Sequence, residues 1–287
     1  RKEKLRMKRV ALLEPGFIRD WNNLNSIKAF KEKNQDFYID VYMCSYDFIG
    51  FKHKETTDKS VIQGSNQVTI ANLIEAFPDV YQIEIKPYHQ VWNHIDRYFK
   101  NNTFNLKDFK PGVIEKWNQK ANTNETKYTL LHKIYAQWHM VYNTYVMSRH
   151  IEDYDIIIRS RFDYNISNLN LSKYPIEQNT IYTKTRNELE SVFGRIHYDG
   201  FAMGDNNSMK KYLNVGSEQG FYDAIENSNL VSESFYETRG KDIKLSSEAM
   251  ITNWSHNYHK LIQKEISNDD LPGDIVMRSN DQKFYKK

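Results

Sequence analysis

The chain has 287 residues, a length that suits one large α/β domain or two domains of about 150 residues each. Its 40 Lys and Arg against 37 Asp and Glu give a formal net charge of +3, and 27% of the residues are charged. These values exclude a disordered polyampholyte and fall short of the basic footprint of a nucleic-acid-binding protein. The 11 Gly and 6 Pro exclude collagen-like and Pro-rich low-complexity chains.

The cysteine count and the length of the apolar runs indicate the cellular compartment of the protein. The single cysteine, Cys44, excludes a disulfide scaffold and zinc fingers, and we expect it to be buried at the end of a strand. No run of 18 apolar residues occurs, which predicts that no helix spans a membrane. The basic residues 1–9 lack the apolar stretch of a signal peptide. We therefore expect a cytoplasmic protein.

The first half of the chain predicts a strand, a helix and a second strand. A short apolar run closed by Pro15-Gly16 is typical of a buried strand over 9–16. An amphipathic helix is predicted at 21–33, followed by a strand rich in aromatic and β-branched residues at 37–47. This order predicts a parallel sheet.

The alternation of helices and strands continues along the chain. The polar segment 48–65 predicts a loop or insertion, and 92–125, where Asn and Lys interleave with aromatics, predicts an irregular lid or acceptor loop. No linker interrupts the series, so we expect a single domain over 1–287 with its core at about 8–266: an α/β fold with a mostly parallel central sheet and helices on both faces. Further helices are predicted at 66–77, 128–151, 207–213 and 247–259, and strands at 80–86, 154–163, 180–183, 199–204 and 261–266.

Polar residues follow several of these strands, at the edge where an open α/β sheet binds its ligand. A diphosphate ligand needs cations or a metal to neutralise it. Arg19, Arg159 and Arg161 could supply cations, and Asp163 could hold a metal. The simpler interpretation is that Arg159 and Asp163 form an ion pair of little energetic weight at a strand end. The residues alone leave both interpretations open.

Five segments, in chain order, carry a resemblance to a known family. They are Val-Ala-Leu-Leu-Glu-Pro-Gly-Phe-Ile-Arg (10–19), Val-Tyr-Met-Cys-Ser-Tyr-Asp (41–47), Tyr-Asp-Ile-Ile-Ile-Arg-Ser-Arg-Phe-Asp (154–163), Asp-Gly-Phe-Ala-Met-Gly (199–204) and Ser-Glu-Ala-Met-Ile (247–251). Together they resemble landmarks of the GT-A-type glycosyltransferases of large DNA viruses, algae and some bacteria. The chain is similar in particular to chlorella-virus enzymes that build the capsid glycan.

The resemblance implies a GT-A-like (Rossmann-like) hexosyl- or pentosyltransferase. Such an enzyme moves a sugar from a nucleotide-diphosphate donor, here expected to be a UDP-sugar, to a glycan or glycoprotein acceptor; a viral enzyme would act in the host cytoplasm. The first strand and its turn would border the nucleoside, and the end of the second strand would lie near the uracil or ribose. The implied donor-binding residues are Pro15, Gly16, Arg19, Ser45, Tyr46, Asp47, Arg159 and Arg161.

The resemblance places Asp163 at the last acid of the metal-binding Asp-x-Asp motif, but residue 161 is Arg instead of Asp. Either Asp163 binds Mn²⁺ or Mg²⁺ with diphosphate oxygens and waters, or Arg161 replaces part of the metal's charge. We expect a divalent metal cofactor.

Two carboxylates are candidate catalytic bases. Glu248 is similar to the base found late in inverting GT-A enzymes, and its alternative role is charge compensation at a helix N-terminus. Asp199 is the second candidate, with a sugar contact as its alternative role. A retaining enzyme would need no such base. The alternative to an enzyme is a non-catalytic nucleotide- or carbohydrate-binding module on the same fold.

Aromatic and histidine residues give weaker signals. We expect Trp92, Trp117 and Tyr128 to be candidates for stacking on an acceptor sugar. His256 and His259 could share a helix face, but no Cys or third His is placed to complete a zinc site with them.

Overall fold

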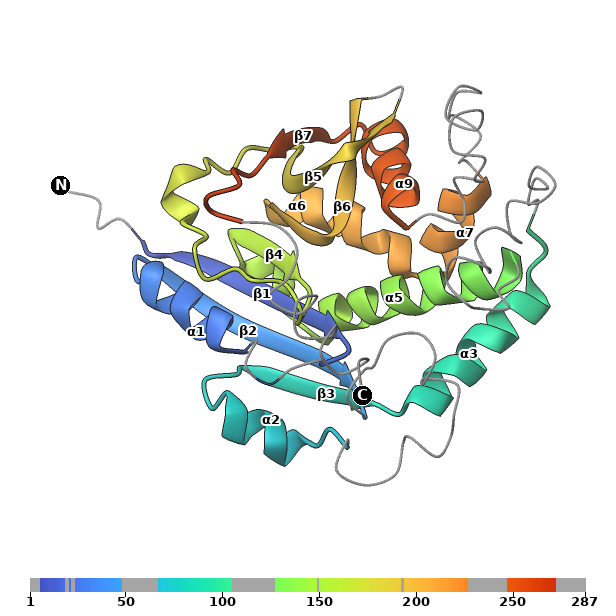
Figure 1. Ribbon diagram of the computed structural model, residues 1–287, viewed down its shortest axis with the longest axis horizontal. Coiled ribbons are helices and arrows are strands. Elements are labelled where there is room, and N and C mark those ends of the chain that lie inside the picture. Colours follow the sequence, from blue (N-terminus) through green and yellow to red (C-terminus); the bar gives the residue numbers. More distant parts are fainter. Residues whose placement is uncertain are drawn as a thin grey trace, which may run out of the picture.

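The computed structural model describes residues 6–18, 21, 24–47, 67–104, 127–148, 150–191, 194–226 and 247–271. These residues contain a seven-stranded sheet in the order β3-β2-β1-β4-β6-β5-β7 (Figure 1). The strands are β1 (Lys8–Gly16), β2 (Phe37–Tyr46), β3 (Gln82–Lys86), β4 (Ile156–Ser160), β5 (Thr180–Ser191), β6 (Gly194–Gly204) and β7 (Ile262–Glu265).

Most strand pairs in the sheet are parallel. β1 pairs in parallel with β2 and β4, β2 with β3, and β5 with β7. β6 is the exception, because it runs antiparallel to both β4 and β5. The mixed α/β class with a mostly parallel central sheet, predicted from the sequence, is confirmed.

Helices cover both faces of the sheet, as predicted. On one face, called here the α1 face, lie α1 (Leu24–Lys33) and α2 (Ile70–Ala76), which pack through Leu24, Phe30 and Leu73. The opposite face, called here the α5 face, is covered by a larger group of helices. They are α3 (Tyr88–Asn101), α5 (Lys127–Met147), α6 (Asn206–Leu213), α7 (Glu218–Glu226) and α9 (Ser247–Thr252), the last continued by a π-helical turn, Asn253–Tyr258.

The central strands are apolar on both sides because helices cover both faces. In β4, Ile156 and Ile158 pack on the α1 face while Ile157 packs on the α5 face. A strand buried in this way has a continuous apolar sequence instead of an alternating one. This isoleucine run lies in the middle of the sheet. The predicted burial of Cys44 is confirmed, and this burial raises the pKa of its thiol to about 12.

Three predictions of local structure were wrong or incomplete. The start of the segment predicted to be irregular, 92–125, is helical because α3 buries Val91, Ile95 and Tyr98 along one stripe; residues 105–126 lie outside the described part. The helix α7 was not predicted. The β5 and β6 strands extend beyond 180–183 and 199–204, because they pair with each other as far as Ser191 and Gly194.

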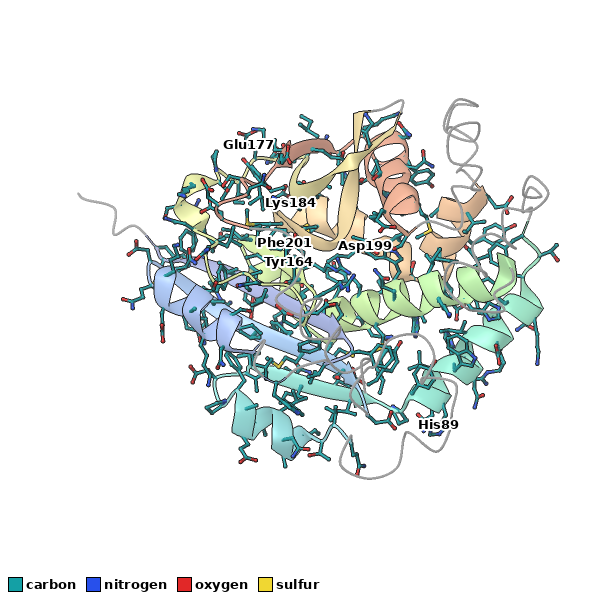
Figure 2. All side chains as sticks on the ribbon, viewed as in Figure 1. His89, Tyr164, Glu177, Lys184, Asp199 and Phe201 are labelled. Carbon is teal, nitrogen blue, oxygen red and sulfur yellow. The ribbon has the colours of Figure 1, made fainter. Side chains whose placement is uncertain are left out.

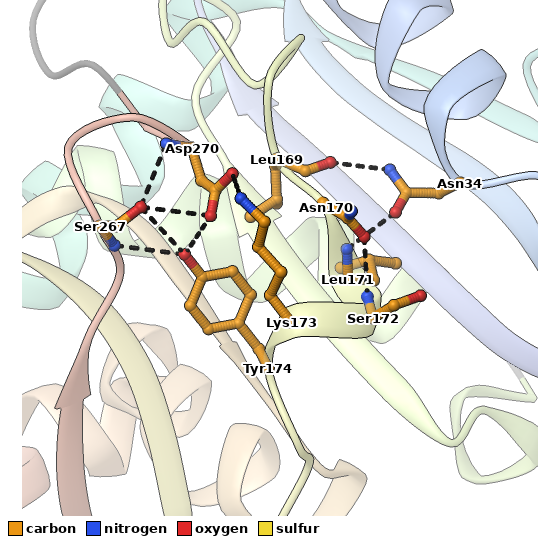
Figure 3. A network of polar contacts seen from close by, with 9 residues as sticks. All are labelled: Asn34, Leu169, Asn170, Leu171, Ser172, Lys173, Tyr174, Ser267 and Asp270. Carbon is orange, nitrogen blue, oxygen red and sulfur yellow. Dashed lines mark hydrogen bonds and ion pairs between the residues drawn. The ribbon is translucent and has the colours of Figure 1, made fainter.

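Two polar networks fix the segment that follows β4 (Figure 3). The Asn34 amide, just after α1, donates to Leu169 O and accepts from Leu171 N, each at 2.8 Å. Asp270 accepts hydrogen bonds from Lys173 Nζ at 2.9 Å and from Tyr174 Oη at 2.6 Å. These contacts attach residues 169–174, beyond β4, to the end of α1 and to Asp270.

Among the residues that the structure describes, no helix has the length and apolar character needed to cross a membrane.

Candidate functional site

The carboxyl ends of β1 and β4 meet at one edge of the sheet. Leu13 pairs with Arg159 in the parallel register of these strands, so the residues that follow each of them emerge side by side. The chain proceeds from β1 to β2 and β3 on one side of β1 and then returns to β4 on its other side. Open α/β sheets bind ligands at such a switch point. The predicted ligand edge therefore coincides with the switch point of this fold.

β6 brings a third polar segment to this edge. It runs antiparallel to β4, and the backbone N–H of Arg161 donates to Gly200 O at 3.1 Å. Asp199 precedes this glycine within β6 and is labelled in Figure 2. The predicted residues Arg159, Arg161, Asp163 and Asp199 are thus brought together by strands that are distant in the sequence.

The guanidinium of Arg161 lies between two buried carboxylates. Its Nε donates to Asp163 Oδ1 at 2.8 Å and its Nη2 to Asp163 Oδ2 at 2.6 Å. Its Nη1 lies 3.6 Å from Asp199 Oδ1. Bidentate contacts of this kind are among the stronger hydrogen-bonded pairs in proteins. The ion pair expected at this strand end therefore exists, but Arg161 forms it instead of Arg159.

The second oxygen of Asp199 contacts α5. Gln137 Nε2 donates a hydrogen bond to Asp199 Oδ2 at 2.7 Å. Arg161 and Gln137 thus approach different oxygens of the carboxylate, which fixes its orientation. Asp199 is buried at its position.

Arg159 is fully buried beneath the cluster. Its Cζ lies 5.2 Å from the ring centroid of Trp138, within the range of a cation–π interaction. None of its three guanidinium nitrogens has a hydrogen-bond partner in the part of the chain that the structure describes. Burial lowers its pKa, whereas nearby Tyr212 and Asp199 raise it; an Arg side chain keeps its charge in proteins. A buried cation with unused donors is costly and favours an anion close to it.

Glu14 adds a titratable group at the end of β1. Burial raises the pKa of this carboxyl to about 8, and the charge of Asp163 acts in the same direction. Arg159 and a hydrogen bond from Ser160 oppose the shift without cancelling it. The protonated, uncharged form of the Glu14 carboxyl is therefore favoured at neutral pH.

The arrangement around Asp163 does not fit a divalent metal. Both of its oxygens accept hydrogen bonds from Arg161, and a metal shared with Asp199 would need the position of the guanidinium. No group of three or more His, Cys, Asp or Glu side chains able to hold a metal ion occurs among the described residues. The metal expected at Asp163 remains a prediction that this geometry does not favour.

The other predicted donor-binding residues lie at the ends of β1 and β2. Gly16 has a positive φ of 108°, which ends β1 in a conformation that suits glycine. Ser45 and Tyr46 are buried, and the Tyr46 hydroxyl donates to Ala136 O at 3.4 Å. These two side chains therefore support the edge from within. Pro15 is also buried, and Arg19 lies outside the described residues.

Aromatic side chains form a wall beside this edge. The ring centroid of Phe17 lies 4.2 Å from that of Tyr46 and 6.0 Å from that of Tyr88. Trp92 stacks on Tyr88 at 5.7 Å. Among the residues predicted to stack on a sugar, Trp92 is thus packed within this wall. Trp117 and the side chain of Tyr128 lie outside what the structure describes.

Glu248 lies in the first turn of α9, as predicted. The preceding Ser247 accepts a hydrogen bond from Trp138 Nε1 at 2.9 Å, and Trp138 is also the ring beside Arg159. The start of α9 therefore connects to the cluster through one shared tryptophan. His256 and His259 lie farther along the same helical segment, in and just after its π-helical turn.

Sequence reasoning missed three contributors to the cluster. In the sequence, Glu14 is only one residue of a strand-end segment, Trp138 belongs to the apolar stripe of a helix, and Gln137 does not stand out. The available signal for Gln137 was a polar residue next to the apolar stripe of its helix. That signal cannot identify Asp199 as its partner, because the contact depends on how β6 packs against α5.

Comparisons with known proteins give only distant likenesses. No family model and no curated protein matches the chain. Among solved structures it is similar to galactosyltransferase LgtC in complex with donor and acceptor sugar analogs, with 8% identity and a TM-score of 0.38, over 91% of this chain and 73% of that one. An active-site mutant of LgtC gives 7% identity, a TM-score of 0.38 and the same coverage.

Mouse xyloside xylosyltransferase 1 in its apo form is similar with 8% identity and a TM-score of 0.37, over 91% of this chain and 85% of that one. TM-scores at this level are too low to assign a function or a named fold to this chain.

Proposed function

We propose that the protein is a glycosyltransferase that transfers a sugar from a nucleotide-diphosphate donor, with UDP as the nucleotide, to a glycan acceptor. The observation that carries the proposal is the buried guanidinium of Arg159, whose donors are unused among the described residues. It lies at the switch point, where an α/β sheet binds ligands. A diphosphate supplies the oxygen acceptors that such a group requires.

The neighbouring side chains support the same ligand class. The aromatic wall of Phe17, Tyr88 and Trp92 flanks the edge and offers a surface of the kind on which a base or sugar ring packs. Gly16 ends β1 without a side chain, and an ideal Cβ there would meet no atom of the described residues within 4 Å. A ligand can therefore approach the backbone at this turn.

In the proposed transfer, an acceptor hydroxyl attacks the anomeric carbon of the donor sugar as the bond to the diphosphate breaks. An inverting transfer needs a carboxylate to accept the hydroxyl proton. We assign this role first to Glu248, in the first turn of α9. Asp199 is the second candidate, and its fixed orientation also suits a contact with a sugar hydroxyl.

Thermal-shift and calorimetric titrations with UDP, GDP and inorganic phosphate test donor binding. We expect UDP to raise the melting temperature more than phosphate does. Release of free sugar from a panel of UDP-sugars and GDP-sugars, with Mn²⁺ or Mg²⁺ present, tests turnover. Failure of every nucleotide and nucleotide sugar to bind or react would refute the proposal.

A matched pair of variants tests the role of Arg159. Replacing a buried, poorly satisfied charge by an apolar residue of similar size is often neutral or stabilising, so Arg159→Met should remain folded. We expect it to bind UDP at least tenfold more weakly than the wild type. Arg97→Met, at an exposed position on α3, should leave UDP affinity unchanged. Equal UDP affinity in all three proteins would remove Arg159 from the site.

A second candidate function is a nucleotide-binding module without turnover. It is favoured by one observation: the Asp163 carboxylate is neutralised by Arg161, which also lies beside Asp199. Tight UDP binding without sugar release from any UDP-sugar, in the presence of varied glycan acceptors, would favour the module over the enzyme.

A further inference from the structure

A single planar cation spans two carboxylates at the switch point. Two nitrogens of Arg161 contact both oxygens of Asp163, and the third faces Asp199 at 3.6 Å. A Mn²⁺ or Mg²⁺ ion held by the same two residues would need their oxygens at about 2.0–2.6 Å. The ion would therefore occupy the volume that the guanidinium fills, and both cannot be present together.

The guanidinium is difficult to displace. The Arg161 side chain is 22% exposed, and those of Asp163 and Asp199 are 5% and 7% exposed. Charges shielded to this degree interact more strongly than surface ion pairs, and removal of one partner leaves a buried charge uncompensated.

The backbone holds Arg161 in place. Its N–H donates to Gly200 O at 3.1 Å, and its carbonyl accepts from Tyr164 N at 2.8 Å. The turn that carries Asp163 is thus closed by one hydrogen bond and attached to β6 by another. The polar networks at Asn34 and Asp270 restrict the chain that follows (Figure 3).

We propose that Arg161 is a built-in cation that takes the place of a divalent metal between Asp163 and Asp199, so that the site binds its anionic ligand without Mn²⁺ or Mg²⁺. The exclusion of metal stands on the geometry alone, whereas the statement about the ligand rests on the proposed function. Arg159 lies close enough to interact electrostatically with Arg161 and Asp199. Among the described residues of the cluster, these two arginines therefore lie beside the carboxylates that a divalent ion would need.

Direct titration with Mn²⁺ tests the exclusion without any nucleotide. The electron paramagnetic resonance signal of free Mn²⁺ should be unchanged by the wild-type protein. Arg161→Asp places two carboxylates two residues apart and should reduce the free signal at submillimolar protein. The matched control Arg97→Asp adds the same charge at an exposed site on α3 and should behave like the wild type.

Two results would overturn the exclusion. One is binding of Mn²⁺ by the wild type as tightly as by Arg161→Asp. The other is a folded Arg161→Asp variant, judged by circular dichroism, that binds no more Mn²⁺ than the control does. If Arg161→Asp does not fold, Arg161→Gln takes its place, because it removes the cation without adding charge and should also increase Mn²⁺ binding.

Calorimetry with UDP tests the second half of the proposal. We expect the dissociation constants in EDTA and in Mn²⁺ to agree within twofold, and a tenfold gain in affinity from Mn²⁺ would contradict it. If UDP binds in neither condition, the proposed function fails, while the Mn²⁺ titration still decides whether Arg161 excludes a metal.

Discussion

The carboxylate of Asp47 accepts a hydrogen bond from the backbone N–H of Tyr88 at 2.9 Å. Asp47 immediately follows β2, and Tyr88 is the first residue of α3. The N-terminal N–H groups of a helix have no partner within the helix, so a side-chain acceptor stabilises that end. Here the acceptor comes from a distant strand, and it connects the end of β2 to the helix that carries Trp92.

This contact predicts a difference between two substitutions of Asp47. Asp47→Ala removes the acceptor and should lower the free energy of unfolding by about 1 kcal/mol. Asp47→Asn keeps an acceptor oxygen and should lose less. Urea unfolding followed by tryptophan fluorescence measures both values, and a variant Asp47→Ala as stable as the wild type would show that the hydrogen bond contributes nothing.

The parallel part of the fold could be predicted because its strands are buried on both faces. The run Ile156–Ile158 and the strand ended by Pro15-Gly16 are continuous apolar segments that few other structures would bury. The α3 helix was missed because its buried stripe, which includes Val91 and Ile95, is interleaved with Asn, His and Lys. In that sequence the helical period was less evident than the polar composition.

The candidate site could be predicted only as a location. Strand-end residues converge in any parallel sheet, so the grouping of Arg159, Arg161 and Asp163 followed from topology. The direction in which each side chain points did not follow from topology. The burial of Arg159 depends on Trp138 from α5, and the approach of Asp199 to Arg161 depends on the antiparallel register of β6.

The buried Glu14 carboxyl predicts a loss of stability at high pH. Burial raises its pKa in the folded protein to about 8 from the ordinary value of 4.5. Such a group contributes its full stability to the folded state when the pH is below its pKa in the unfolded chain. This contribution is lost as the pH rises through its pKa in the folded protein. Between about pH 4.5 and pH 9, the loss should be on the order of 5 kcal/mol.

Urea unfolding at pH 5, 7 and 9 measures this effect. Glu14→Gln removes the ionisation and should make the free energy of unfolding much less sensitive to pH in this range. Glu75→Gln, at an exposed position on α2, is the matched control and should follow the wild type. A wild-type protein as stable at pH 9 as at pH 5 would contradict the prediction.

His139 predicts a loss of stability at low pH. Burial lowers its pKa to about 4, and the neighbouring His94, stacked on it at 4.6 Å, and Lys86 act in the same direction. The neutral imidazole is therefore favoured in the folded protein. Its contribution is present above the ordinary imidazole pKa of 6.5 and is lost as the pH falls toward 4, by on the order of 3 kcal/mol.

His139→Phe should reduce this acid sensitivity, because a phenyl ring keeps the aromatic contacts and cannot be protonated. The control is His89→Phe at an exposed position of α3 (Figure 2). Thermal unfolding between pH 4 and pH 7 compares the variants. If His139→Phe and His89→Phe lose stability equally on acidification, His139 is not the responsible group.

The close packing around Gly216 predicts that this position tolerates no side chain. An ideal Cβ there would lie 1.9 Å from Trp138 O and 2.7 Å from Tyr142 Cβ, so Gly216→Ala must move the turn Asn214–Gly216 away from α5. We expect a loss on the order of 3 kcal/mol or more. Gly16→Ala adds a methyl group in open space at a positive φ and should cost about 1–2 kcal/mol. Thermal unfolding distinguishes the two, and equal losses would contradict the close contact.

The two candidate roles of Glu248 predict different effects of Glu248→Gln on the rate of sugar transfer, on UDP binding and on stability. If its carboxylate takes the proton from the hydroxyl of the glycan acceptor, Glu248→Gln should lower the rate of sugar transfer by about 10²–10⁴-fold. The UDP dissociation constant should be unchanged. If it only compensates the charge of the α9 N-terminus, the rate should be kept and stability should fall by about 0.3–1 kcal/mol. Glu218→Gln changes a first-turn glutamate of α7 and is the matched control for that electrostatic effect. Transfer kinetics and UDP calorimetry on both variants decide between the roles, and weakened UDP binding in Glu248→Gln alone would exclude the role of base and assign the residue to the donor.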